Sequence, residues 1–449
     1  MSNFNVIIVG GGLAGPLLAS GLLRKGVKVD LYERLEEHAK RDGYTIRVSQ
    51  PCLQAFEDCL DADAFDQIKR RMGHFEGNQE TTPIWYDYRM KPLLNMSRFS
   101  TNYHSSSPMD RVVLRDTIMQ KPVKSFSRYE MIKTESGQEK VRVWFQDGTS
   151  ADGDVLIAAD GNHSRVSPVS EVYFRLSSQA SSCIYLTIGR LESHPIIGRH
   201  LVHRLSQVVE RNVGHSPKML PRCPDSYLLL SQDVFCCRQV AFYTSSAISN
   251  NTNCIKAYLP KDRQEEVKED DEDLDFDNQT ASFTFSMSLP TADCPPDILE
   301  RDTNETWKFL SEAIPDWHQD YRDIIEVVRG QEIHTFRPRA AVRPSLDWRK
   351  NVRSPQEPLR GHPRVWLMGD AMHAMMPNRG MGGNQAMLDT KVIVPFLERL
   401  NYLAKKTGSV SEEAIGVACD EYEREMIPCS FDRLGGGEWR NETHRYPIS

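Results

Sequence analysis

A glycine-rich turn near the start of the chain constrains the fold more than any other feature. The apolar run 6–9 leads directly into Gly10, Gly12 and Gly15, and the next apolar segment ends at Glu33. A buried strand, a glycine turn, a helix and a second strand ending in an acid are the parts of a dinucleotide-binding βαβ unit. We therefore expect an α/β fold with a nucleotide at this turn.

Each residue of this first motif has its own physical role. Gly10 permits the tight turn, Gly12 lets the backbone approach a pyrophosphate, and Gly15 lets the helix pack on the strand. The N-terminus of the helix offers free N–H groups and a partial positive charge to the phosphates. Glu33 follows Gly15 by 18 residues and is placed to accept hydrogen bonds from ribose hydroxyls. The simpler alternative is an ordinary strand–helix turn with a surface Glu33.

Two further apolar strands end in motifs that contain aspartate and glycine. An apolar segment at 154–159 ends in Asp160 and Gly161, and it follows a hairpin pattern with an Asp-Gly turn. Another apolar strand, at 364–368, precedes a glycine-rich loop that opens a new helix. The residues of this third motif are Gly369, Asp370, His373, Pro377, Gly380, Gly382 and Gly383. The first motif alone does not choose between NAD and FAD, so the choice depends on these two downstream motifs.

With these motifs the chain resembles the FAD-dependent monooxygenases of the para-hydroxybenzoate hydroxylase type. The resemblance rests on the three motifs in this order and on the segment Arg-Val-Val-Leu that begins at Arg111, which is similar to the family's flavin-contacting arginine segment. The residues around the motifs are most similar to fungal members that act on secondary metabolites. The resemblance implies a Rossmann-like FAD-binding domain interleaved with a sheet-rich substrate domain.

The positions of the motifs divide the chain into discontinuous domains. The expected FAD-binding domain consists of residues 1–70, 105–165 and 335–395, the substrate domain of 71–104 and 166–334, and a C-terminal helical segment and tail of 396–449. Residues 281–289 give the clearest strand of the substrate domain, because apolar and small polar residues alternate there with a period of two. The segments 83–88 and 226–230 are weaker candidates for the same sheet.

The resemblance implies that the third motif surrounds the flavin. Asp370 would accept a hydrogen bond from the ribityl chain or its neighbouring hydroxyls. Gly380, Gly382 and Gly383 would allow backbone N–H groups to approach the pyrimidine side of the flavin, where a helix N-terminus favours an anionic reduced ring. Pro377 would fix a backbone kink that faces the ring. A loop cap for Asp370 and a plain turn for Pro377 are the alternatives.

Other residues are expected to complete the cofactor site. Arg111 would pair with FAD oxygens, and Arg47 resembles a position at which family members meet the cofactor. Asp160 and Gly161 would help to order the pyrophosphate region and the approach of the nicotinamide. The alternatives are an ordinary surface ion pair for Arg111, a solvated arginine on a strand for Arg47, and a purely structural role for Asp160 and Gly161. We interpret His373 as a structural histidine of the motif, with a catalytic base as the alternative.

The resemblance also implies the reaction. NADPH or NADH would reduce the FAD, and with O2 the enzyme would hydroxylate or epoxidise an aromatic or other electron-rich small molecule. No motif marks the substrate pocket, so no catalytic side chain is assigned. Two alternatives stay open: another flavin enzyme, such as an oxidase, isomerase or cyclase, or a degenerate non-catalytic FAD-binding protein. The second rests on departures from the family pattern at Ser167, Met381 and Gly383, and on the short stretches near 115–140 and 167–182.

Composition excludes several other classes. With 55 basic and 62 acidic residues, the net charge of −7 leaves no basic stripe for nucleic acid. No apolar stretch reaches 18 residues, so we expect no transmembrane segment. The N-terminus shows no basic region followed by an apolar signal core, which predicts a cytoplasmic protein. The ten cysteines are irregularly spaced and form no Cys-x-x-Cys pattern, so we expect reduced thiols and no metal site.

Overall fold

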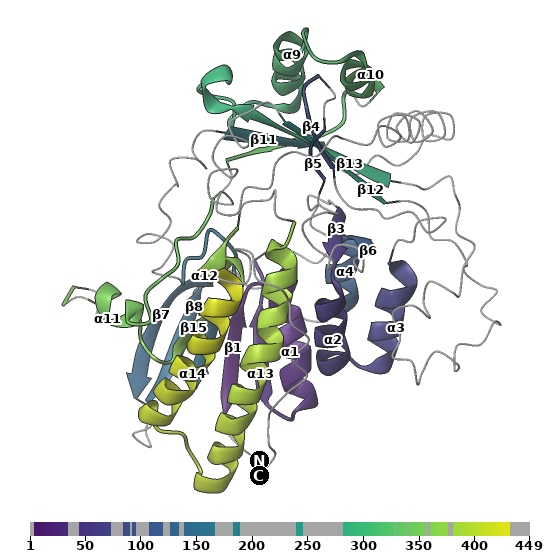
Figure 1. The fold of residues 1–449 in the computed structure, drawn as a ribbon. Coiled ribbons are helices and arrows are strands. Elements are labelled where there is room, and N and C mark those ends of the chain that lie inside the picture. Colours follow the sequence, from purple (N-terminus) through teal and green to yellow (C-terminus); the bar gives the residue numbers. More distant parts are fainter. Residues whose placement is uncertain are drawn as a thin grey trace, which may run out of the picture.

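The structure, a computed structural model, contains a parallel sheet with helices and a second, antiparallel sheet (Figure 1). The residues that it describes are 4–34, 45–72, 84–89, 92–95, 107–119, 126–133, 139–166, 183–188, 239–245, 282–327, 329–337, 339–353, 355–356, 360–375 and 380–431. The three sequence motifs lie within these residues, except for Pro377, which falls outside them.

The first sheet has four parallel strands in the order β15-β10-β1-β2. Their bounds are β1 (Asn5–Val9), β2 (Lys28–Tyr32), β10 (Val155–Ala158) and β15 (Val365–Leu367). Every residue of the two central strands, β1 and β10, is buried. Continuous apolar runs of this kind are typical of parallel strands that are covered on both faces. This sheet confirms the predicted α/β fold.

Long helices cover this sheet. In Figure 1, α1 (Ala14–Arg24) lies beside α13 (Gly382–Thr407), and α14 (Glu412–Phe431) packs against α13. The nearby helices are α2 (Gln50–Cys59), α3 (Ala62–Arg71), α4 (Arg111–Ile118), α11 (Trp348–Val352) and α12 (Asp370–His373). Two small antiparallel sheets complete this part: β3 (Thr45–Val48) with β6 (Ser107–Asp110), and β7 (Phe126–Lys133) with β8 (Glu139–Phe145) and β9 (Ser150–Gly153).

The second large sheet has six antiparallel strands in the order β14-β11-β13-β12-β4-β5. Their bounds are β4 (Ile84–Asp87), β5 (Pro92–Asn95), β11 (Cys183–Ile188), β12 (Gln239–Ser245), β13 (Ser282–Pro290) and β14 (Ile333–Phe336). Helices α9 (Thr303–Ala313) and α10 (Gln319–Val327) lie on the side of this sheet that faces away from the parallel sheet (Figure 1). A short 3-10 helix, Thr291–Asp293, follows β13. A separate apolar core that includes Trp307, Leu310 and Trp317 joins these helices to the sheet.

Two of the strands predicted for the second domain are present in the structure. The strand predicted at 281–289 is confirmed as β13, and the weaker candidate at 83–88 as β4. The candidate at 226–230 lies outside the described residues. The expected domain boundaries stay predictions. Helix α13 continues through the boundary expected at 395, and strand β14 spans the boundary expected between 334 and 335. Among the described residues, no helix is long and apolar enough to cross a membrane.

Candidate cofactor site

The parallel sheet brings the predicted motifs to one edge. Val9 at the end of β1 is in register with Tyr32 of β2 and with Ala158 of β10, and Ala158 is in register with Leu367 of β15. The four carboxyl ends are therefore level with one another. In open α/β sheets, ligands bind beyond this edge. The glycine turn, Glu33 and the two aspartate-containing motifs follow directly after these strand ends.

Two glycines of the first motif leave no room for a side chain. A Cβ atom at Gly10 would lie 2.2 Å from the carbonyl oxygen of Ala159, and the φ angle of Gly10 is +116°. A Cβ atom at Gly15 would lie 2.0 Å from the carbonyl oxygen of Gly10. These contacts explain the tight turn and the close packing of α1. A Cβ atom at Gly12, in contrast, would meet no atom within 4 Å, so the space beside this residue is open.

Glu33 reaches back to the glycine turn from the end of β2. Its Oε2 atom accepts a hydrogen bond of 2.6 Å from the backbone N–H of Gly11. The N–H of Gly10 donates to the carbonyl of Tyr32 at 2.8 Å, so the turn is held to β2 at two successive peptides. The carboxylate thus has a structural contact within the turn, and its hydrogen bonds to a ribose stay a prediction.

Asp160 and Gly161 lie immediately after β10. The Oδ2 atom of Asp160 accepts a hydrogen bond of 2.9 Å from the N–H of Arg165, which closes the loop that follows the strand. Burial raises the pKa of Asp160, although hydrogen bonds from Ser164 and from backbone N–H groups oppose this. The other carboxylate oxygen, Oδ1, is buried and has no hydrogen-bond partner among the described residues. An acceptor in this state is available to a ligand hydroxyl or amide.

The third motif meets the first motif at the N-terminus of α13. A Cβ atom at Gly382 would lie 3.8 Å from the Oδ1 atom of Asp370, and one at Gly383 would lie 3.7 Å from the Cδ1 atom of Leu13. The first residues of a long helix therefore lie between Asp370 and the glycine turn. Gly380 lies two residues before this helix and is exposed. Free N–H groups at such a helix end favour a negatively charged group.

The two arginines predicted for the site, Arg47 and Arg111, lie on different elements and interact with different parts of the third motif and of α13. Arg47 lies on β3, where its carbonyl accepts a hydrogen bond of 2.6 Å from the Nδ2 atom of Asn384. Asn384 also accepts from the N–H of Ser49 at 2.9 Å, so its side chain ties β3 to the start of α13. Arg111 is the first residue of α4 and lies within electrostatic reach of Asp370. Burial raises the pKa of Asp370, while His373 and Arg111 lower it.

Sequence reasoning missed three residues that organise this edge. Arg115 donates from Nε to the carbonyl of Gly11 at 2.6 Å, Asn384 ties β3 to α13, and Asp389 pairs with His373. The Oδ2 atom of Asp389 also accepts from the N–H of Gly369 at 2.8 Å. In the sequence, Arg115 is 104 residues from Gly11, and Asn384 is 337 residues from Arg47. Asp389 is 16 residues from His373 and 20 residues from Gly369. The only available signal was that Arg115 follows Arg111 by one helical turn.

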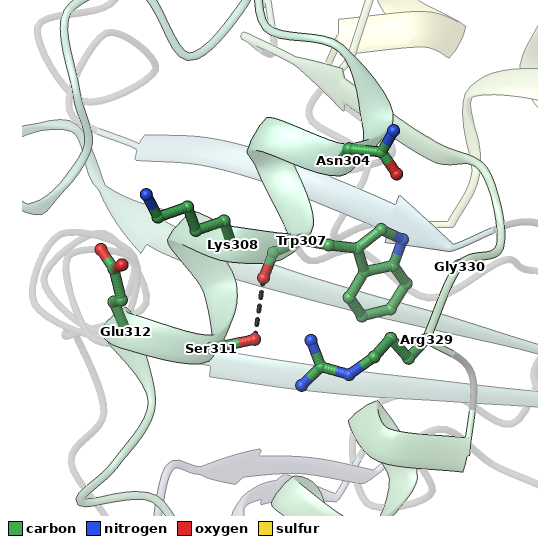
Figure 2. Close-up of a pocket in the computed structure, with 7 residues that line it drawn as sticks. All are labelled: Asn304, Trp307, Lys308, Ser311, Glu312, Arg329 and Gly330. Carbon is green, nitrogen blue, oxygen red and sulfur yellow. Dashed lines mark hydrogen bonds between the residues drawn. The ribbon is translucent and has the colours of Figure 1, made fainter.

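A cavity of about 370 Å³ among the described residues lies elsewhere, beside α9 of the second domain (Figure 2). Most of its lining comes from α9, including Trp307, Lys308 and Glu312, and the remainder from Arg329 and Gly330. None of the residues predicted for the cofactor site lines it. Arg329 is already paired with Glu326. We therefore assign the cofactor to the edge of the parallel sheet and give this cavity no part in cofactor binding.

Comparison with known families supports that assignment. The sequence matches the FAD binding domain family over residues 3–207 and 319–400. The chain belongs to this family. The match includes the glycine turn, the Asp160 motif and the start of α13. FAD is therefore the cofactor of the protein, as the sequence predicts.

Individual relatives agree with the family. The chain is 24% identical to the FAD-dependent monooxygenase thnD of Trichoderma harzianum, over 94% of this chain and 89% of that protein. It is 21% identical to the dual O-methyltransferase/FAD-dependent monooxygenase CTB3 of Cercospora beticola, over 87% of this chain but only 42% of that protein. The chain thus spans less than half of this second relative. Together these relatives confirm the predicted resemblance to FAD-dependent monooxygenases.

A solved structure confirms the fold. HpxO of Klebsiella pneumoniae, complexed with FAD and uric acid, superposes with a TM-score of 0.54 at 19% identity, over 97% of this chain and 89% of that one. At this identity the likeness concerns the arrangement of the elements alone. It agrees with a parallel FAD-binding sheet interleaved with a second sheet.

The residues at the sheet edge fit FAD. The open space beside Gly12 leaves room for a pyrophosphate, and the start of α13 offers N–H groups to an anionic part of the cofactor. The unpartnered Oδ1 atom of Asp160 adds a buried acceptor. Backbone donors, a helix end and carboxylate acceptors are the groups that a dinucleotide with phosphates and hydroxyls requires.

Proposed function

We propose that the protein uses NADPH or NADH and O2 to hydroxylate or epoxidise an aromatic or other electron-rich small molecule in secondary metabolism. The observation that carries this proposal is the convergence of three FAD motifs at one edge of the parallel sheet, in a member of the FAD binding domain family. Two fungal relatives named as FAD-dependent monooxygenases support the reaction type. We also propose a cytoplasmic location, which cell fractionation would test.

In this proposal the chain binds and orients the cofactor, whereas the bound FAD supplies the redox chemistry and the reaction with O2. The turn at Gly12 receives the pyrophosphate, and Glu33 orders the turn and accepts from the ribose. Asp370 accepts from the ribityl hydroxyls. The N-terminus of α13, at Gly382 and Gly383, stabilises negative charge on the ring through its free N–H groups.

Two arginines near His163, Arg34 and Arg339, support the use of a nicotinamide dinucleotide. Burial lowers the pKa of His163, and Arg339 and Arg34 lower it further. The three residues come from the loop after β10, the segment after β14 and the end of β2, yet both arginines lie within electrostatic reach of His163. A positive region beside the Asp160 motif favours the phosphates of a reductant that approaches FAD from this side.

The second domain would select the substrate. Its six-stranded sheet lies beyond the sheet edge that carries the FAD motifs (Figure 1). Residues 170–330, in which no cofactor motif occurs, supply β11, β12 and β13 to this sheet. We therefore expect substitutions there to change which molecule is accepted. Substitutions at Asp370 or in Gly382 and Gly383 should affect all substrates alike.

Purified protein provides the test. We expect a yellow preparation that releases FAD and not FMN on denaturation, and slow NADPH oxidation that rises when a cognate aromatic metabolite is added from a panel. The rise is expected because reduction gated by substrate avoids loss of reductant as peroxide. A colourless protein that cannot be reconstituted with FAD would contradict the proposal.

A further inference from the structure

Arg115 is a buried arginine whose side chain ends at the glycine turn. The residue is 4% exposed, and its Nε atom donates a hydrogen bond of 2.6 Å to the carbonyl oxygen of Gly11. Its Nη1 atom pairs with Asp116 at 2.8 Å. Arginines are almost never fully buried unless they are paired. Here a buried guanidinium is directed at a backbone carbonyl of the turn that receives the cofactor.

The hydrogen bond to Gly11 sets the direction of the following N–H group. No cis peptide occurs among the described residues, and in a trans peptide the carbonyl and the next N–H point in opposite directions. Because the carbonyl of Gly11 points to Arg115, the N–H of Gly12 points away from α4. This N–H has no partner among the described residues, and the space beside Gly12 is open.

Arg115 and Glu33 together restrict a segment that is otherwise very free. Residues 10–12 are three consecutive glycines, which lose more conformational entropy on ordering than any other residues. Glu33 holds the N–H of Gly11 and Arg115 holds its carbonyl, each at 2.6 Å. The peptides on both sides of Gly11 are thus fixed by charged side chains from different segments. A turn fixed before binding loses less entropy when the ligand arrives.

The position of Arg115 in its helix links the first motif to the third. Arg111 and Arg115 are four residues apart and therefore lie on the same face of α4. Arg111 is within electrostatic reach of Asp370, whereas Arg115 holds Gly11. One helix face thus hydrogen-bonds to the first motif through Arg115 and lies within electrostatic reach of the third through Arg111.

We propose that Arg115 is a positioning residue for FAD binding, which holds the carbonyl of Gly11 so that the N–H of Gly12 is directed to the pyrophosphate. The inference rests on FAD binding at this sheet edge. Removal of the Nε donor should weaken every ligand that carries the pyrophosphate. It should leave ligands without phosphate unaffected.

The test compares Arg115→Met with Arg71→Met. Arg71 contacts the same helix through the hydroxyl of Thr117 but is exposed, so it is a matched control. With the apoproteins, we expect Arg115→Met to bind FAD and ADP about tenfold to a hundredfold more weakly than the wild type, by the same factor for both. Adenosine affinity and the binding of all three ligands by Arg71→Met should be unchanged.

Two further results separate this role from a general effect on folding. Arg115→Lys keeps the charge but has no donor at the Nε position, so it should retain most of the defect in ADP binding. If Arg115→Met fails to fold, Arg115→Lys decides the question. Wild-type affinity for FAD and ADP in a folded Arg115 variant would overturn the inference. Absence of FAD binding by the wild type would instead overturn the proposed function.

Discussion

The Nε2 atom of His373 lies 2.6 Å from the Oδ2 atom of Asp389, and neither side chain is exposed to solvent. The same oxygen accepts the N–H of Gly369. Asp389 thus holds the turn that carries Asp370 against α13, whose first residues form part of the candidate site. This agrees with the interpretation of His373 as a structural residue.

Loss of one partner of this pair should be strongly destabilising. In His373→Gln the carboxylate of Asp389 is left buried without an opposite charge, which typically costs about 3–5 kcal/mol of unfolding free energy. Urea unfolding of the apoprotein measures this loss. The double variant His373→Gln/Asp389→Asn should be more stable than the sum of the single losses predicts. Strict additivity would show that the two residues do not act as a pair.

The pair should also make stability depend on pH. Burial opposes protonation of His373, but Asp389 outweighs it and raises the pKa of His373. The contribution of a group with a raised pKa is complete below its unfolded value, about 6.5 for histidine, and is lost as the pH rises through the folded value. The stability advantage of the wild type over His373→Gln should therefore be largest near about pH 6 and shrink towards about pH 9. If the stability advantage of the wild type over His373→Gln increased over this pH range, the pKa of His373 would not be raised in the folded protein.

The glycines of the first motif should separate cofactor binding from folding. Gly12→Val should fold, because a Cβ atom at this position would meet no atom within 4 Å, but should not bind FAD, because the side chain fills the space of the pyrophosphate. Gly15→Val should not fold, since its Cβ atom would lie 2.0 Å from the carbonyl of Gly10. Circular dichroism and FAD titration distinguish the two. A Gly12→Val protein that purifies yellow would refute the placement of the pyrophosphate.

Glu33 offers a graded test. Glu33→Ala removes the acceptor for the N–H of Gly11 and the proposed acceptor for the ribose. Hydrogen bonds to charged groups contribute about 1.5–3 kcal/mol, so FAD affinity should fall about tenfold to a hundredfold. Glu33→Gln keeps a neutral acceptor and should lose less. Equal affinities of Glu33→Ala and the wild type, by fluorescence titration, would rule out a role in binding.

Asp370 should oppose stability while it supports binding. Burial raises its pKa, so its ionised form is less favourable in the folded protein than in the unfolded chain. This cost is complete at a pH above the folded pKa, decreases as the pH falls through that value, and disappears below the unfolded value of about 3.9. Asp370→Asn should therefore unfold at the same or a higher temperature than the wild-type apoprotein, yet bind FAD more weakly. The exposed Asp63→Asn is the control, and a lower unfolding temperature for Asp370→Asn would contradict this reasoning.

The sequence allowed the fold to be predicted where a local pattern was sufficient. The buried run of β1 and the alternation of β13 identify strands without reference to other parts of the chain. Asn384 could not be assigned in this way, because its side chain binds Arg47 and Ser49 from more than 330 residues away. Such contacts depend on how α13 packs, which no local period encodes.

The candidate site shows the same division. The motif glycines and Asp370 could be located from strand ends, because parallel strands bring their carboxyl ends together. Arg115 and Asp389 instead lie within helices, where a charged residue usually indicates a solvated face. The two side chains are in fact buried, at 4% and 0% exposure, so this general pattern could not identify them.

Oxygen-18 labelling tests the central claim, that the protein is a monooxygenase, most directly. Turnover of a cognate substrate with NADPH under ¹⁸O₂ gas should give a product that contains one labelled oxygen atom, measured by mass spectrometry, and chelators should have no effect. Efficient conversion to a product without labelled oxygen would contradict the account and move the enzyme to the oxidase, isomerase or cyclase class.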